Sequence, residues 1–388
     1  MSVINDIFTT MIKRTLQKSL EKYLFKGKTI LLTGPRQVGK TTLLKQISFP
    51  DNAKTIWLNG DNPDDRAILN NMNSLKARQL FPKGTIVIID EAQRLENAGL
   101  TLKIIHDNGE EIQLIATGSS SFELTDKIKE SLTGRKFTFR LYPVSLQEIA
   151  AHTSFFDMIR TLETRMIFGS YPEVINHPSM EKEILVELTN DYLYKDIFAL
   201  KQVRKPQVLE KLIQALAFQT GQQVSYRELA NMIQVDKETV ERYIYMLEEA
   251  FIIFRLPSFS RNLRNELKRA RKIYFYDVGI RNAVIHQLNP LSLRNDTGAL
   301  WENLLITERA KALEYKRAFR NRYFWRTSRQ QEINYIEEFD GKLFAYEFKW
   351  NPAKKTSFPA SFLKAYPHIR CKVITRDNFY EFINGQDG

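Results

Sequence analysis

One stretch near the N-terminus, KTILLTGPRQVGKTTLLKQI at residues 28–47, restricts the fold more than any other. Its apolar residues 30–32 predict a buried parallel strand, and the apolar spacing after position 41 predicts a helix. The loop between them matches the pattern GxxxxGK(S/T) in full. This order of strand, loop and helix predicts an α/β fold in which the loop binds phosphate at the carboxyl end of a parallel sheet.

Each part of the loop has a chemical reason. Gly34 and Gly39 allow the backbone to turn so that its N–H groups point at phosphate oxygens. Lys40 reaches the β- and γ-phosphates, the hydroxyl of Thr41 binds Mg²⁺, and the helix N-terminus adds its dipole. We therefore expect ATP and Mg²⁺ as cofactors, with Thr41 as one metal ligand. The residues expected to contact the nucleotide are Gly34, Pro35, Arg36, Gln37, Val38, Gly39, Lys40, Thr41, Thr42 and Ser119.

A second strand ends in the acidic pair that nucleotide hydrolysis requires. In GTIVIIDEAQRL, residues 84–95, positions 85–89 are nearly all β-branched, as in a strand buried on both faces. Asp90 would hold a magnesium-bound water, and Glu91 would act as the base that activates the attacking water. We therefore predict Asp90 as a second metal ligand, and Lys40, Asp90 and Glu91 as catalytic residues.

A third strand is predicted in IQLIATGSSSFEL, residues 112–124. It ends in polar groups at Thr117 and Ser119, where ligands sit in open α/β sheets. Either of these two residues senses the γ-phosphate, or they form an ordinary strand-to-helix turn with a serine cap. The sequence leaves both interpretations open.

Two arginines follow beyond the nucleotide-contacting loops, Arg135 and Arg140. An arginine presented to a neighbouring subunit's γ-phosphate would stabilise the transition state. We favour Arg135 for this catalytic role because Gly134 can expose it on a turn. The alternative is a surface or interdomain ion pair.

These motifs and four later ones resemble a single family along almost the whole chain. GPRQVGKTT, IIDEAQ, ATGSSS and LTGRKFTFRLYPVSLQE are followed by FGSYPEVI at 168–175, YLYKDIF at 192–198, YFYDVGIRNAV at 274–284 and GALWENLLITE at 298–308. In this order they resemble the prokaryotic AAA-type (AAA+) P-loop ATPases with a C-terminal DUF4143 region. The resemblance implies an AAA+ ATPase core, a winged-helix segment and a C-terminal part related to PD-(D/E)XK nucleases. It also implies assembly into a ring, often a hexamer.

Composition sets the expected partner and compartment. The 388 residues carry a net charge of +12 and a sequence pI near 9.5, an excess that favours a polyanion such as DNA. Cys371 is the single cysteine, which excludes intrachain disulfides and thiolate metal sites. The sequence begins with a charged amphipathic pattern and contains no apolar run long enough for a membrane span. We expect a cytoplasmic protein with no membrane partner.

The segment 216–260 contains a candidate DNA reader. Ser225 precedes one short predicted helix and Asp236 begins a second, a pattern typical of a helix-turn-helix followed by a wing strand. Lys237 and Arg242 on the second helix are the predicted DNA contacts, although several glutamates make this helix weakly basic. The alternative is a module that only packs against its neighbours.

The strongest basic run of the chain follows, RNLRNELKRARK at residues 261–272, with six Lys or Arg against one Glu. Phosphate contacts from this run would depend on salt and not on base sequence. The candidate residues are Arg261, Arg264, Lys268, Arg269 and Arg271. A solvated basic face is the alternative.

A candidate nuclease-like site lies in a predicted hairpin whose turn is Asp340-Gly341. In PD-(D/E)XK nucleases a helix-borne Glu and two strand carboxylates bind Mg²⁺, and a Lys positions the attacking water. By this resemblance the matching positions are Glu302, Asn334, Glu347 and Lys349. Asn334 is neutral and a weak Mg²⁺ ligand, so metal binding should be greatly weakened. Glu332 lies on the same strand face as Asn334 but at a different depth.

We therefore favour a non-cleaving nuclease-like fold over an active nuclease, and both over an unrelated hairpin. The predicted fold is α/β, with an AAA+ P-loop core and helical lid, a winged-helix segment and a restriction-endonuclease-like C-terminal domain. The expected boundaries are 1–145, 146–215, 216–260 and 261–388. The expected function is ATP-driven action on duplex or branched DNA by a homo-oligomer, a hexameric ring. A nucleotide-controlled scaffold for protein partners and an ATP-gated, metal-dependent nuclease stay open as alternatives.

Overall fold

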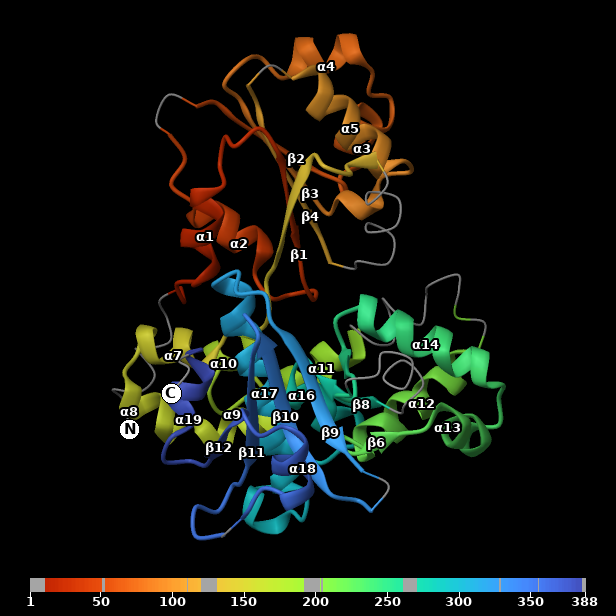
Figure 1. Cartoon of the computed structure of the whole chain (residues 1–388). Helices are drawn as coiled ribbons and strands as arrows, with labels where there is room; N and C mark the ends of the chain where they lie inside the picture. The colour runs from red at the N-terminus through yellow and green to blue at the C-terminus, as the bar shows by residue number, and fades with distance from the viewer. Residues whose placement is uncertain are drawn as a thin grey trace. The chain divides into compact units, whose positions relative to one another are not determined.

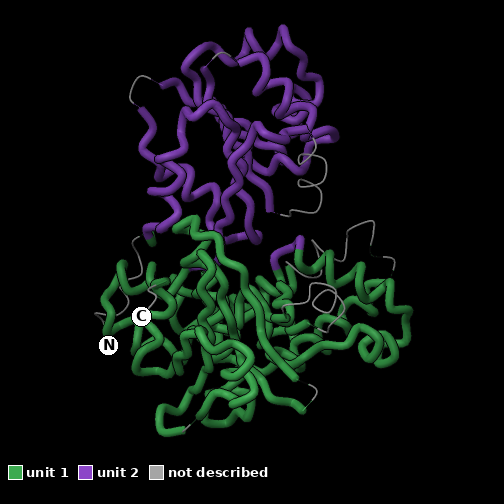
Figure 2. The backbone as a smooth tube through the Cα atoms, viewed as in Figure 1, with its two compact units in different colours: residues 1–12, 145–248, 252–388 green, residues 13–144, 249–251 purple. Residues whose placement is uncertain are grey.

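The computed structural model describes residues 11–50, 53–109, 111–119, 131–191, 203, 205–260, 271–327, 329–354 and 356–385. The chain forms two compact units (Figure 2). The N-terminal unit comprises residues 13–144 with 249–251, and the C-terminal unit comprises residues 1–12, 145–248 and 252–388. Nearly all of the three later predicted segments therefore lie within one compact unit.

A five-stranded sheet forms the centre of the N-terminal unit, in the order β2-β3-β4-β1-β5, and all its neighbouring strands are parallel. The strands are β1 (Thr29–Thr33), β2 (Thr55–Asn59), β3 (Ile86–Asp90), β4 (Gln113–Gly118) and β5 (Lys136–Arg140). Every residue of β1, β3 and β4 is buried, as their apolar runs predict. Because β4 lies between β1 and β3, the carboxyl ends of these three strands bring the phosphate loop, Thr117 and the acidic pair to one edge of the sheet.

Helices cover both sides of this sheet (Figure 1). They are α1 (Leu16–Lys22), α2 (Lys40–Gln46), α3 (Pro63–Asn70), α4 (Ser74–Leu80) and α5 (Ala98–Asn108), with a 3₁₀ turn at Ala92–Arg94. Residues of α3, α4 and α5, among them Leu69, Ala77 and Leu102, pack with Val87 and Leu114 of the sheet in one apolar cluster. Burial of this face holds the strand ends in place.

The C-terminal unit combines helices with two small sheets. Its helices are α7 (Leu146–His152), α8 (Phe155–Arg160), α9 (Leu162–Phe168), α10 (Pro172–Asn176), α11 (Glu181–Asn190), α12 (Pro206–Phe218), α13 (Tyr226–Ile233), α14 (Lys237–Glu249), α16 (Val278–Val284), α17 (Thr297–Tyr315), α18 (Ala360–Ala365) and α19 (Phe379–Ile383). An antiparallel sheet has the order β6-β8-β7, from β6 (Gln223–Val224), β7 (Ile253–Leu256) and β8 (Arg271–Phe275). A mixed sheet has the order β12-β11-β10-β9, from β9 (Asn321–Arg326), β10 (Glu332–Phe339), β11 (Lys342–Phe348) and β12 (Arg370–Ile374).

Local sequence signals explain several of these elements. The side chain of Ser225 accepts a hydrogen bond from the N–H of Glu228, and that of Asp236 accepts one from the N–H of Thr239, so each side chain caps one of the two predicted helices. Strands β10 and β11 form the predicted hairpin, and its turn residues Asp340 and Gly341 both have positive φ, at 48° and 69°. A two-residue turn of this kind matches the right-handed twist of the strands that it joins.

The FGSYPEVI and YFYDVGIRNAV motifs meet in the core of the C-terminal unit. The buried carboxylate of Asp277 accepts hydrogen bonds from the backbone N–H groups of Ser170, Gly279 and Ile280. Gly169 has φ +74°, and a Cβ atom there would lie 1.9 Å from an oxygen of Asp277. Asp277 therefore satisfies buried backbone N–H groups of both motifs, and Gly169 leaves the space that its carboxylate occupies.

The longest described helix, α17, is buried along most of its length and packs against β8 and β11. Among the described residues, no helix is long and apolar enough to cross a membrane.

Candidate functional site

Positive backbone φ angles shape the phosphate loop that follows strand β1. Gly34 has φ +153°, Gln37 +60° and Gly39 +88°. A Cβ atom at Gly34 would lie 2.1 Å from the carbonyl oxygen of Leu141, so this position requires glycine. Gly39 makes the left-handed turn after which helix α2 begins at Lys40. The loop thus has the conformation in which successive N–H groups can face an anion.

The ammonium group of Lys40 is folded into this loop. It donates hydrogen bonds to the carbonyl oxygens of Gly34, at 3.0 Å, and Pro35, at 2.8 Å. Burial lowers the pKa of Lys40 to about 8, although the nearby carboxylates of Glu91 and Asp90 act in the opposite direction. A phosphate group would add further negative charge beside this buried cation.

Asp90, at the end of strand β3, is surrounded by hydroxyl groups. Thr41 Oγ1 donates to Asp90 Oδ2 at 2.7 Å, and Thr117 Oγ1 donates to Asp90 Oδ1. A carboxylate in contact with a threonine hydroxyl is an oxygen donor set that suits Mg²⁺. Thr41 and Asp90 would hold this ion beside the loop, so the residues present fit both predicted cofactors.

Glu91 is held in a defined orientation beside Asp90. Its backbone is left-handed, with φ +50°, and its N–H donates to Thr117 Oγ1 at 3.1 Å. Its carboxylate accepts hydrogen bonds from Ser119 Oγ, at 3.2 Å, and from Gln93 Nε2. Gln93 was not predicted as a site residue, although it stands two positions after the acidic pair. Thr117 and Ser119 therefore contact the acidic pair, and their role as phosphate sensors stays a prediction.

Arg135 and Arg140 lie at opposite ends of strand β5. Because β5 is parallel to β1 and Thr33 lies opposite Arg140, Arg140 is at the end of the sheet that carries the phosphate loop. Arg135 is at the other end, where its guanidinium pairs with Asp107 at 2.8 Å. The transition-state role of Arg135 stays a prediction, and it requires a second copy of the chain.

The predicted DNA contacts on helix α14 have partners within that helix. Lys237 pairs with Glu241 at 3.1 Å, and both side chains are about half exposed. The guanidinium of Arg242 lies 5.4 Å from the ring centre of Tyr243. Exposed pairs of this kind are weak, so they leave both cations available to a polyanion.

Most of the basic run 261–272 lies outside the described residues. This holds for Arg261, Arg264, Lys268 and Arg269. Arg271 opens strand β8 and lies 5.9 Å from the ring centre of Tyr226. Lys272, the last residue of the run, was not a candidate contact, and its side chain is fully buried.

The four predicted positions of the nuclease-like site meet in the C-terminal unit, at helix α17 and strands β10 and β11. Asn334 bridges the two carboxylates: its Nδ2 donates to Glu302 at 2.8 Å and its backbone N–H donates to Glu347 at 3.2 Å. Lys349 pairs with Glu347 at 3.2 Å. Burial raises the pKa of Glu347, and Lys349 opposes this effect.

Lys272 and Tyr274 complete this cluster from strand β8, and neither was predicted. The ammonium of Lys272 contacts Glu302 at 2.9 Å and also contacts Glu332, and the hydroxyl of Tyr274 donates to Glu302 at 2.5 Å. Burial opposes the charge of Lys272, but these two carboxylates outweigh burial and raise the pKa of the ammonium. Across the described ranges, no three His, Cys, Asp or Glu side chains are placed to hold a metal ion. The cluster does not fit the Mg²⁺ that a PD-(D/E)XK nuclease requires.

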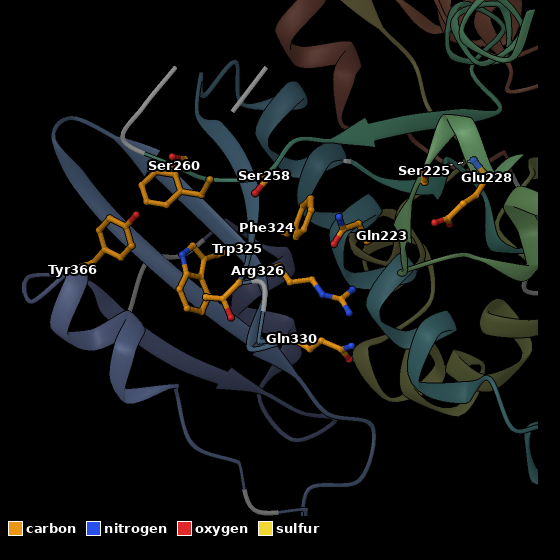
Figure 3. Close-up of a pocket in the computed structure, with 12 residues that line it drawn as sticks. Gln223, Ser225, Glu228, Ser258, Ser260, Phe324, Trp325, Arg326, Gln330 and Tyr366 are labelled. Carbon is orange, nitrogen blue, oxygen red and sulfur yellow. Dashed lines mark hydrogen bonds between the residues drawn. The ribbon is translucent and has the colours of Figure 1, made fainter. Parts of the chain in front are cut away.

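A pocket of about 820 Å³ borders this cluster (Figure 3). Arg326 lines the pocket and also pairs with Glu332 at 3.4 Å. The lining residues come from strand β6, helix α13, strand β9 and the segments beside them, and they include aromatic, amide, hydroxyl and charged groups. The lining residues are Gln223, Ser225, Glu228, Ser258, Phe259, Ser260, Phe324, Trp325, Arg326, Thr327, Gln330 and Tyr366.

The parallel sheet, the glycine-dependent loop and the acidic pair define the N-terminal unit as a P-loop nucleotide-binding domain. Family models match three consecutive parts of the chain: an AAA domain at 26–150, a domain of unknown function (DUF8612) at 159–292, and a domain of unknown function (DUF4143) at 297–386. The chain is therefore an AAA-type P-loop ATPase that carries a C-terminal DUF4143 domain, as its motifs predict.

Two uncharacterized proteins are similar to most of this chain. An uncharacterized protein of Mycobacterium tuberculosis is 26% identical over 353 residues, which is 90% of this chain and 75% of that protein. An uncharacterized protein of Methanocaldococcus jannaschii is 26% identical over 331 residues, 79% of this chain and 72% of that protein. Among solved structures, a RuvB mutant of Thermogota maritima matches 67% of this chain and 96% of its own, at 15% identity and a TM-score of 0.29.

Proposed function

We propose that this ATPase is a Mg²⁺-dependent motor or remodeller that acts on DNA as a homo-oligomeric, hexameric ring. The observation that carries the ATPase part is the contact of Thr41 with Asp90 beside the oriented carboxylate of Glu91. Mg²⁺ at this position would neutralise phosphate charge. Lys40 would donate to phosphate oxygens, and Glu91, held by Gln93 and Ser119, would take a proton from the attacking water.

Charge and topology support DNA as the partner. The net charge of +12 and the run of basic residues between 261 and 271 favour a polyanion. Elements α12, β6, α13, α14, β7 and β8 follow one another in the order of a winged helix, with the sheet order β6-β8-β7. The pocket of Figure 3, lined by aromatic, amide and arginine groups between this segment and strand β9, has the chemistry to contact bases and phosphates.

The test is steady-state ATP turnover of the full chain, with and without duplex, branched and single-stranded DNA. We expect DNA to stimulate turnover, and we expect Lys40→Ala and Glu91→Gln to abolish it. Glu91→Gln should still bind nucleotide, because it keeps a side chain of the same shape. Lys18→Ala, which changes an exposed lysine of helix α1, is the matched control and should keep full turnover. Turnover that no nucleic acid changes would contradict DNA as the partner.

One observation favours the alternative of a nucleotide-controlled protein scaffold. Helix α8 exposes Phe155, Phe156 and Ile159, and the side chain of Phe156 is 78% exposed. If proteins are the partners, Phe156→Ser should abolish function while neutralising Lys237 and Arg242 should leave it intact. The ATP-gated nuclease is tested separately with plasmid and junction DNA in Mg²⁺ or Mn²⁺. We expect no cleavage at high enzyme concentration.

A further inference from the structure

The C-terminal cluster contains as many cationic side chains as carboxylates. The three carboxylates are Glu302, Glu332 and Glu347, and the three cations are Lys272, Arg326 and Lys349. Two of these pairs are partly open to solvent, but the ammonium of Lys272 is fully buried between Glu302 and Glu332. A buried charge persists only where opposite charges and hydrogen bonds surround it. The cluster is therefore neutral without any added ion.

Both carboxylate oxygens of Glu302 accept hydrogen bonds from other side chains of the cluster. Its Oε1 accepts from Lys272 at 2.9 Å and from the Tyr274 hydroxyl at 2.5 Å, while its Oε2 accepts from Asn334 at 2.8 Å. Three donors from three side chains thus point at one carboxylate. A divalent cation needs the same oxygen lone pairs, so it would have to displace these donors.

The orientation of Asn334 follows from its neighbours. The backbone N–H of Phe348 donates to one end of its amide at 3.0 Å, and only the oxygen of that amide can accept this bond. The amide nitrogen must then face Glu302 as a donor. An aspartate at this position would place a second negative charge against Glu302 in place of a donor. Asn334 is therefore matched to a cluster that contains an ammonium group, and is not simply a lost metal ligand.

We infer that Lys272 is a built-in cation that takes the place of a divalent metal in the DUF4143 carboxylate cluster, so that this domain holds its fold without metal. The inference deepens the proposed non-cleaving role of the C-terminal domain and rests on it. Lys272 acts on the cluster as a structural cation, held by strand β8 against helix α17 and strand β10. Removal of the ammonium leaves Glu302 without its cationic partner and leaves the cluster with one more carboxylate than cations, which is the arrangement that attracts a metal ion.

The experiment uses the nucleotide-free full chain, so that the ATP site adds no nucleotide-bound metal. Mn²⁺ binding is measured by calorimetry or electron paramagnetic resonance, and thermal unfolding is followed with EDTA and with Mn²⁺. The variants are Lys272→Met, Lys272→Arg and the double variant Lys272→Met/Glu302→Gln. Lys311→Met is the matched control, because Lys311 is also buried and its ammonium pairs with the carboxylate of Glu308 at 2.6 Å.

We expect the wild-type chain to bind no Mn²⁺ through Glu302 and Glu347 and to unfold at the same temperature in EDTA and in Mn²⁺. Lys272→Met should lower the unfolding temperature by roughly 10 °C in EDTA. Saturating Mn²⁺ should restore about half of this loss. Lys272→Arg and the double variant should lose less stability, and Lys311→Met should lose stability with no response to Mn²⁺.

Two results would overturn the inference. The first is stoichiometric Mn²⁺ binding by the wild-type chain that Glu302→Gln or Glu347→Gln abolishes, which needs no Lys272 variant to fold. The second is a Lys272→Met protein with wild-type stability and no response to Mn²⁺. Neither result depends on ATP turnover or its response to DNA, so a failure of this inference is distinguishable from a failure of the proposed function.

Discussion

The buried ammonium of Lys40 predicts that nucleotide binding takes up a proton in mildly alkaline solution. In the free protein burial lowers the pKa of Lys40 to about 8. Because the folded pKa lies below the ordinary value for lysine, protonated Lys40 opposes folding, and this cost disappears as the pH rises through the interval from 8 to 10.5. Phosphate oxygens at the ammonium would raise its pKa again, so binding and protonation are coupled.

The magnitude follows from the fraction of Lys40 that is neutral before binding. With a pKa near 8, about 0.9 of the side chains are neutral at pH 9 and about 0.1 at pH 7. Binding of a non-hydrolysable ATP analogue with Mg²⁺ should therefore take up about 0.9 proton at pH 9. The dissociation constant should rise about tenfold per pH unit above pH 8 and should be nearly constant just below it.

Calorimetry in two buffers of different ionisation enthalpy measures this proton uptake directly. Lys40→Arg is the matched control, because a guanidinium stays protonated throughout this range and should take up no proton at pH 9. Tight binding at pH 9 with no proton uptake would refute the reasoning. The same proton uptake in Lys40→Arg would also refute it, because another group would then be responsible.

Three further substitutions test contacts on which the fold and the site depend. Gln93→Ala should lower kcat about tenfold with little change in KM, because it removes hydrogen bonds that orient Glu91 and Ser119 without touching the nucleotide; steady-state kinetics separates the two constants. Gly34→Ala should abolish nucleotide binding in the same calorimetric assay while the chain stays folded by circular dichroism, since its Cβ atom would lie 2.1 Å from a carbonyl oxygen. Glu337→Gln should lower the free energy of unfolding by about 3 kcal/mol in a denaturant titration, because the carboxylate forms a buried two-bond pair with Arg309; an unchanged midpoint would contradict this.

The N-terminal unit was predictable because its signals are local. Short apolar runs such as residues 30–32 and 86–89 predicted the buried strands, and the spacing of Gly34, Gly39, Lys40 and Thr41 predicted the loop. The hydrogen bonds of Gln93 were not predictable, because they depend on the left-handed backbone at Glu91, which no propensity of glutamate favours.

The burial of Lys272 was not predicted because of its position in the sequence. It ends a run of basic residues, and such runs are usually read as solvated surface. The two-residue period of a strand could have indicated a shared face. Lys272 and Tyr274 are two residues apart, so strand β8 places both side chains on the same side of the sheet. Only the packing of β8 beside helix α17 shows that this face meets Glu302.

The two carboxylate sites of this chain differ in the donors that surround them, and that difference determines where a metal can bind. Asp90 accepts hydrogen bonds from two neutral threonine hydroxyls, so its charge is not neutralised by them and a cation can replace the weak donors. Glu302 accepts from an ammonium, a phenol and an amide, so its charge is already compensated inside the protein. Removing a hydroxyl contact costs about 1 kcal/mol, whereas breaking a buried ion pair costs about 3–5 kcal/mol. Metal chemistry in this chain is therefore expected at Asp90, and a metal at Glu302 would first have to displace Lys272.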